Sequence, residues 1–121
     1  MIPLQQFAAV AQSGGVASIT VDANWGVVTP SSSPNTSAQR TLTVPLGTSD
    51  IRFDVTAAPA GTLEYQKNAA AYAAVVDEAT LSVTTSDTLR FRLTGASDGA
   101  TIVVYDNTTS VQVGTCVLTT L

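Results

Sequence analysis

The fold is decided by the stretch Asp87-Thr-Leu-Arg-Phe-Arg-Leu-Thr94. Its leucine and phenylalanine side chains alternate with Arg90 and Arg92, the period of two expected for a β-strand with one apolar and one solvated face. The same alternation precedes it in Leu81-Ser-Val83 and follows it in Thr101-Ile-Val-Val-Tyr105. Turn-forming residues separate these runs. The stretch therefore predicts a series of antiparallel strands joined by short turns.

Similar short runs occur along the rest of the chain. They predict strands at residues 19–21, 41–44, 51–55, 62–65, 111–113 and 115–119. With 121 residues, the chain is long enough for one domain with its own core. We therefore predict an all-β fold, a single antiparallel β-sandwich of roughly seven to nine short strands. Periodicity does not encode strand order, so an immunoglobulin-like and a jelly-roll-like topology both stay open.

Three segments depart from this pattern. Residues 1–17 are small and apolar and predict a short helix or arm, which packs either on its own domain or on a neighbouring subunit. The sandwich domain then spans residues 18–121. Residues 29–39 are rich in serine and proline and predict a loop. Residues 69–76 are rich in alanine; their short length favours a strand or an irregular edge, with a helix as the alternative.

Composition and charge exclude several kinds of partner. Only 12% of the residues are charged, about half the roughly 25% of an average chain. The net charge is −4 and the cationic residues do not cluster, so the chain lacks the basic stripe that nucleic acids require. No run approaches the roughly 20 apolar residues of a membrane span. The N-terminus has no basic segment, so we expect no signal peptide.

The residue types that usually perform catalysis are scarce. The chain has no histidine, the commonest general base and metal ligand. Asp77 and Glu78 are adjacent and would point to opposite faces of an extended strand, which argues against an acid/base pair. Asp98, Asp106 and Asn107 could meet at one end of the sandwich and bind Ca²⁺, but turn formation accounts for all three. We therefore expect no enzyme, no cofactor and no metal.

Two single residues have structural interpretations. A lone tryptophan in a small sandwich is usually a core anchor, so we expect Trp25 to be buried; an exposed contact residue is the alternative. Cys116 has no basic or cationic neighbour in sequence, and we expect a small buried apolar residue rather than a nucleophile.

The segment from Val83 to Tyr105 contains a strand, a Ser-Asp-Thr-Leu turn, an alternating strand and a Gly/Ser/Thr-rich turn. In this it resembles the C-terminal hairpins of small immunoglobulin-like or fibronectin-like sandwiches in tailed-bacteriophage virion proteins. The resemblance covers roughly residues 80–106 and brings no catalytic residue. It implies a structural role on the exterior of the virion, as a capsid decoration or cement protein or as a fibre or tail accessory domain.

These observations predict a non-enzymatic virion protein that binds the capsid lattice. Its partners would be the major capsid protein and further copies of itself. The contact residues we expect are Leu4, Phe7 and Val10 in the arm and Tyr72 and Val75 in the alanine-rich edge. The alternative is a fibre or tail adhesion domain that recognises a glycan or a host protein. Sugar binding favours aromatic residues at turn tips, whereas the three tyrosines lie in or beside predicted strands.

Overall fold

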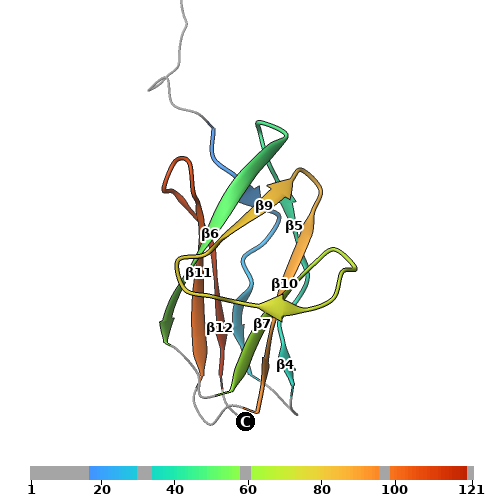
Figure 1. The fold of residues 1–121 in the computed structure, drawn as a ribbon, viewed down its shortest axis with the longest axis vertical. Helices are drawn as coiled ribbons and strands as arrows, with labels where there is room; N and C mark the ends of the chain where they lie inside the picture. Colours follow the sequence, from blue (N-terminus) through green and yellow to red (C-terminus); the bar gives the residue numbers. More distant parts are fainter. Residues whose placement is uncertain (1–16, 30–33, 58–60, 96–98, 120–121) are drawn as a thin grey trace, which may run out of the picture.

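The computed structural model describes residues 17–29, 34–57, 61–95 and 99–119. Within these ranges the chain forms eleven strands in two sheets packed face to face, which confirms the predicted β-sandwich (Figure 1). The strands are β2 (Thr20–Val21), β3 (Gly26–Val28), β4 (Asn35–Thr36), β5 (Arg40–Thr43), β6 (Thr48–Ala57), β7 (Thr62–Lys67), β8 (Ala73–Ala74), β9 (Thr80–Thr84), β10 (Thr88–Thr94), β11 (Ala100–Asp106) and β12 (Gln112–Leu118). Three of them, β2, β4 and β8, have only two residues each.

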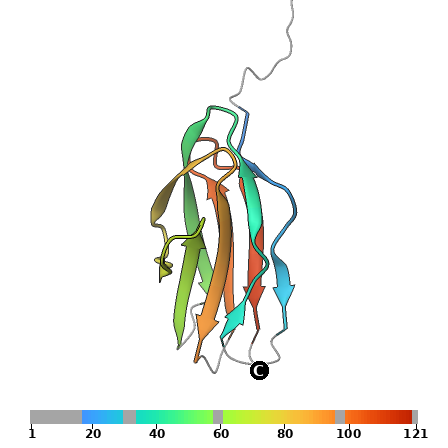
Figure 2. The same cartoon turned by 90° about the vertical axis from the view of Figure 1, so that its right-hand side faces the viewer.

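The strand order is that of an immunoglobulin-type sandwich. One sheet has the order β2-β5-β10-β7-β8, with β4 also paired to β10, and the other has the order β3-β12-β11-β6-β9. When β2, β5, β6, β7, β10, β11 and β12 are lettered A to G, these seven strands follow the orders A-B-E-D and C-F-G of immunoglobulin domains, and β3, β4, β8 and β9 are additional strands. Figure 2 looks onto the sheet that contains β10 and β5. The strand pairs of the described residues are antiparallel except β3 with β12, which is parallel.

The alternating sequence pattern sets which side chains enter the core. In β10 the side chains of Leu89, Phe91 and Leu93 are buried, while Arg90 and Arg92 are only partly covered. The rings of Phe91 and Phe53 meet edge to face at 5.9 Å between centroids. The buried apolar side chains are Ile19, Trp25, Leu42, Val44, Ile51, Phe53, Leu63, Val83, Leu89, Phe91, Leu93, Ala100, Ile102, Val104, Cys116 and Leu118. Both sheets contribute to this set, so their packing supplies most of the apolar burial.

Trp25 is a core anchor, as predicted. It precedes β3, is 4% exposed and donates a hydrogen bond from Nε1 to the carbonyl of Leu89 at 2.9 Å. Because β3 and β10 belong to different sheets, this bond joins the sheets directly. A Cβ atom at Gly114 of β12 would lie 2.7 Å from Cζ3 of the Trp25 ring. Only glycine therefore fits at this position without displacing the tryptophan.

The prediction of two strands on either side of Gly114 is wrong, because β12 is continuous through it. The register between β11 and β12 shifts between Val104 and Tyr105: Val104 pairs with Gly114 and Tyr105 with Gln112. This bulge adds one residue to β12, so the apolar residues on its two sides no longer follow one period of two. The interrupted period suggested two separate strands. The strand predicted at residues 51–55 is also longer than expected, since β6 spans Thr48–Ala57.

The serine- and proline-rich segment contains ordered polar residues. Asn35 and Thr36 form β4, and Asn35 is 5% exposed. Its side-chain amide donates to the carbonyls of Val28, at 3.1 Å, and Thr119, at 3.0 Å. Ser37 is also buried, and its hydroxyl accepts a hydrogen bond from Phe91 N at 2.9 Å. The predicted loop is thus interrupted by a short strand, and the buried side chains of Asn35 and Ser37 are hydrogen-bonded.

The alanine-rich segment is an irregular sheet edge with a two-residue strand, β8, as the sequence favoured. Next to it, Val75 N donates to the carbonyl of Leu63 at 3.0 Å. Of the predicted arm at residues 1–17, only Ala17 is among the described residues, so Leu4, Phe7 and Val10 lie outside them. No helix in the described ranges is long and apolar enough to cross a membrane.

Candidate functional site

Two arginines project from the outer face of the six-stranded sheet. Because β10 alternates, Arg90 and Arg92 point away from the core on the same side of the strand. Strand pairing with β7 sets Gln66 opposite Arg90 and Glu64 opposite Arg92. The two guanidinium groups therefore lie on one face of the molecule, two residues apart, with different partners.

Arg92 is neutralised and covered. Its Nη2 atom lies 2.8 Å from Glu64 Oε1, and its Nε atom donates to the same oxygen at 3.3 Å. The Cζ atom lies 3.5 Å from the centroid of the Tyr72 ring, a cation–π contact. Tyr72 is one of the residues expected at a partner interface, and here its ring covers the Glu64–Arg92 ion pair. A partly exposed ion pair of this kind contributes about 1 kcal/mol or less to stability.

Arg90 lies instead in a concave, polar part of the same face. Its Nη2 atom donates to Oε1 of Gln39 at 2.6 Å, a neutral acceptor. Among the described residues, ion pairs join Arg52 to Glu78 and Arg92 to Glu64, and none involves Arg90. The concavity is shallow and open to solvent, and it is lined by Gln39, Gln66, Asn68, Ala69, Thr88 and Arg90. No carboxylate is among these lining residues.

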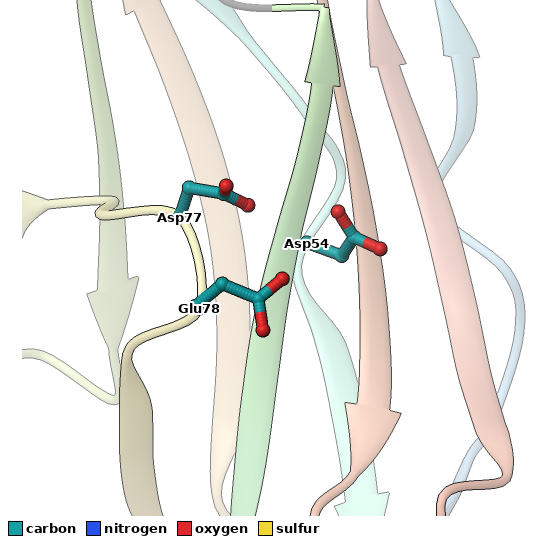
Figure 3. Close-up of side chains that lie close together, drawn as sticks. All are labelled: Asp54, Asp77 and Glu78. Carbon is teal, nitrogen blue, oxygen red and sulfur yellow. The ribbon is translucent and has the colours of Figure 1, made fainter.

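Three carboxylates gather on the other sheet. Asp77 and Glu78 extend from the loop before β9 toward β6, which carries Asp54, and oxygens of the three lie within 4.8 Å of one another (Figure 3). The adjacency argument against Asp77 and Glu78 assumed an extended chain and is wrong. The two residues form a turn in which Glu78 has a φ of 68°, so both side chains reach the same side.

Two of the three carboxylates in this acidic group already have protein partners. Asp77 Oδ1 accepts a hydrogen bond from Val55 N at 2.8 Å, and Glu78 Oε1 lies 3.8 Å from Arg52 Nε. Calcium takes six to eight oxygen ligands, and here two of the three carboxylates are already engaged by Val55 N and by Arg52. The group is therefore better described as a loop held against β6 than as a metal cage.

Asp106 is a buried carboxylate that holds the backbone. It is 2% exposed, and its Oδ2 atom accepts from Ile19 N at 2.9 Å. Its Oδ1 atom accepts from Thr108 N at 2.8 Å and from Thr109 N at 3.2 Å. Burial by itself would raise the pKa of Asp106, but these hydrogen bonds outweigh burial and hold the pKa below its usual value. The side chain thus joins the approach to β2 with the turn after β11.

The other residues considered as possible sites have structural positions. Cys116 is fully buried, as predicted, and burial raises the pKa of its thiol to about 12, so it is not a thiolate at neutral pH. Of the possible calcium ligands, Asp98 lies outside the described residues and Asn107 accepts a long bond from Arg52 Nη1 at 3.5 Å. Val75 is half-buried against the core.

Exposed apolar side chains occur in several parts of the described chain. Val27 of the edge strand β3 is 69% exposed and Leu46 of the turn before β6 is 64% exposed. Val76, beside β8, and Val111, before β12, are also exposed. Single exposed apolar residues are common, but those at β3 and β8 lie along sheet edges, where backbone groups are open to pairing with another chain.

Sequence periodicity identified the arginine-bearing strand but not the partners of each arginine. Gln39, Gln66 and Glu64 are brought to Arg90 and Arg92 by strand pairing, which no local pattern records. Comparisons of the chain with known protein families, with curated proteins and with solved structures found no match in any of the three.

Proposed function

We propose that this chain is a non-enzymatic structural protein of a tailed-phage virion, acting as a capsid decoration or cement protein. It binds the capsid lattice, with the major capsid protein and further copies of itself as partners. The observation that carries the proposal is that four aspartates of the described residues hold backbone N–H groups, so these carboxylates fix turns and loop ends and are not free acids or bases.

Four aspartates illustrate this use of carboxylates. Asp22, Asp77, Asp87 and Asp106 each accept at least one hydrogen bond from a backbone N–H. Such bonds fix turns and loop ends, and hydrogen bonds to a charged acceptor contribute about 1.5–3 kcal/mol each when they are well shielded. The result is a rigid platform with short turns, which suits a protein that must present a constant surface to a repeating lattice.

The surface chemistry supports binding to other proteins. With 12% charged residues, the chain depends little on ion pairs that salt would screen. Edge strands β3 and β8 offer backbone groups for strand addition. The resemblance of residues 80–106 to phage virion sandwiches supports this setting and an exterior position on the particle.

The N-terminal arm is the contact segment in this proposal. Residues 1–17 carry no charged side chain and include Leu4, Phe7 and Val10, which are suited to burial in a partner. A cement protein of this kind uses its arm as the anchor and its sandwich as the exposed body. Tyr72 and Val75 then serve as a secondary contact beside β8.

Purified particles test the proposal. We expect mass spectrometry of virions from cultures that produce the chain to find it in a fixed ratio to the major capsid protein, and immunogold labelling to place it on the capsid. A variant lacking residues 1–15 should keep the circular dichroism spectrum of the sandwich and no longer bind capsids. Absence from particles, or full binding by the truncated chain, would contradict the virion role or the arm, respectively.

A further inference from the structure

The Arg90 concavity has a charge imbalance that its own residues do not correct. Arg90 bonds the neutral oxygen of Gln39, and its Nε atom is buried with no hydrogen-bond partner among the described residues. The nearby carboxylates are engaged elsewhere: Glu64 pairs with Arg92, and Asp87 accepts from Asn68 at 2.9 Å. Arg90 is only partly buried and has no counter-charge among the described residues, so an anion bound beside its guanidinium would gain a charge-assisted hydrogen bond.

The lining is held in place by the fold. Asn68 has a φ of 58°, which asparagine tolerates, and its Oδ1 atom accepts from Thr88 N at 2.9 Å. The Gln66 amide nitrogen donates to the Ala70 carbonyl at 3.0 Å, and the Gln66 amide oxygen has no donor among the described residues. Because β7 and β10 pair through this region, Gln66 and Arg90 stand at fixed positions. A ligand therefore meets a preformed set of amide, hydroxyl and guanidinium groups.

The chemistry of the lining selects one class of ligand. The absence of a lining carboxylate excludes a metal cation, and a single arginine is too little charge for a nucleic-acid backbone. Ala69 is the one apolar lining residue, so the concavity offers no pocket for an apolar anchor. It also lies on the face of the sheet, where the strands are already paired, and not at an edge that an extended peptide could join.

A hydroxylated carboxylate fits these constraints. Arginine is the preferred partner of a carboxylate, and side-chain amides and hydroxyls both donate to and accept from sugar hydroxyls. We propose that the Arg90 concavity binds the carboxylate of an acidic sugar unit, a uronic or sialic acid of a glycan. Neutral sugars favour exposed aromatic faces, whereas this site uses charge and amides instead. The inference is independent of lattice binding, so either can fail without the other.

Nuclear magnetic resonance titration of the full chain tests the site. The probes are a galacturonic acid oligomer and the same oligomer with every carboxylate methylated, which keeps the hydroxyl pattern and removes the charge. We expect the acidic oligomer to shift the backbone amide signals of Gln39, Gln66 and Thr88, and the methyl ester to leave them unchanged. Arg90→Gln should weaken binding about tenfold or more, while Arg90→Lys should retain part of it.

The matched control is the double variant Glu64→Gln/Arg92→Gln. It changes the neighbouring charged pair on the same sheet face while leaving the net charge unchanged, so it should bind the acidic oligomer as the native chain does. The proposal is overturned if the native chain binds neither oligomer, if both oligomers bind equally, or if Arg90→Gln binds as well as the native chain. Binding of penta-aspartate in place of the sugar would also overturn it, in favour of an acidic protein partner.

Discussion

Asp106 and the acidic group formed by Asp54, Asp77 and Glu78 put carboxylates in opposite situations. Asp106 is buried alone and accepts three backbone hydrogen bonds. The acidic group sits at the surface, where oxygens of three like charges lie within 4.8 Å of one another. Two partners offset the repulsion, the backbone N–H of Val55 and the guanidinium of Arg52.

The difference shows that burial alone does not determine how a carboxylate changes the free energy of unfolding. A buried charge is stabilising where several donors face it, because each donor would otherwise be unsatisfied. Exposed charges that share one site are stabilised mainly by water, and their net effect is small. Removing Asp106 and removing a member of the acidic group should therefore change stability by very different amounts, and for Asp54 with opposite sign.

The largest effect is expected for Asp106→Ala. This change leaves the N–H groups of Ile19, Thr108 and Thr109 without their acceptor, in a region where the side chain was buried. We expect the free energy of unfolding to fall by about 3 kcal/mol or more, measured by urea denaturation at pH 7. Asp50→Ala is the control, because Asp50 is exposed on β6 and its loss should cost about 0.5 kcal/mol or less. Equal losses in the two variants would contradict the role of Asp106.

The second expectation concerns pH. At both Asp87 and Asp106, burial raises the pKa of the carboxyl, but the hydrogen bonds to the carboxylate lower the pKa by more. Both carboxyls therefore have a pKa below the ordinary value in the folded chain. In the unfolded chain these groups titrate near pH 3.9. The two carboxylates thus make their full contribution to the free energy of unfolding above about pH 4. This contribution is lost as the pH falls through the lower pKa of the folded chain.

We expect the urea midpoint of the native chain to drop steeply below about pH 4 and that of Asp106→Asn to drop less. Asparagine has no carboxyl group to take up a proton, so the variant lacks the part of the pH dependence that comes from residue 106, although the variant is less stable at neutral pH. If the urea midpoints of the two proteins change in parallel between pH 5 and pH 2.5, the protonation of Asp106 does not cause the loss of stability at low pH.

The sequence predicted the parts of this comparison unequally. Alternation in β10 and β11 was strong enough to identify two central strands and their buried faces, because each strand has one wet and one dry side. Asp106 was recognised only as a turn residue, since its donor Ile19 lies 87 residues away in the chain. The acidic group was not predicted, because the argument about Asp77 and Glu78 assumed an extended chain, whereas Glu78 has a positive φ and lies in a turn.

A smaller loss is expected for Asp77→Ala. It removes the 2.8 Å bond to Val55 N, at a position on β6 beyond the residues that pair with β9. Water can replace this acceptor, so we expect a fall of about 1 kcal/mol or less in the free energy of unfolding. Asp77→Asn keeps an acceptor oxygen and should lie closer to the native chain. A loss as large as that of Asp106→Ala would erase the distinction between the two regions.

The smallest effect, and the one of opposite sign, is expected for Asp54→Asn. Asp54 contributes charge to the acidic group, and its side chain makes no hydrogen bond or ion pair with the described residues. Neutralising it removes repulsion without leaving a donor unsatisfied, so stability should rise by a few tenths of a kcal/mol, on the order of the value of one exposed charge pair. The gain should shrink in 1 M NaCl, where the screening length is about 3 Å.

Glu78→Gln removes the same repulsion but also the contact with Arg52, so it should leave the melting temperature nearly unchanged. If Asp54→Asn instead destabilises the chain at low salt, Asp54 has a stabilising partner, and the acidic group is held together by more than Val55 and Arg52.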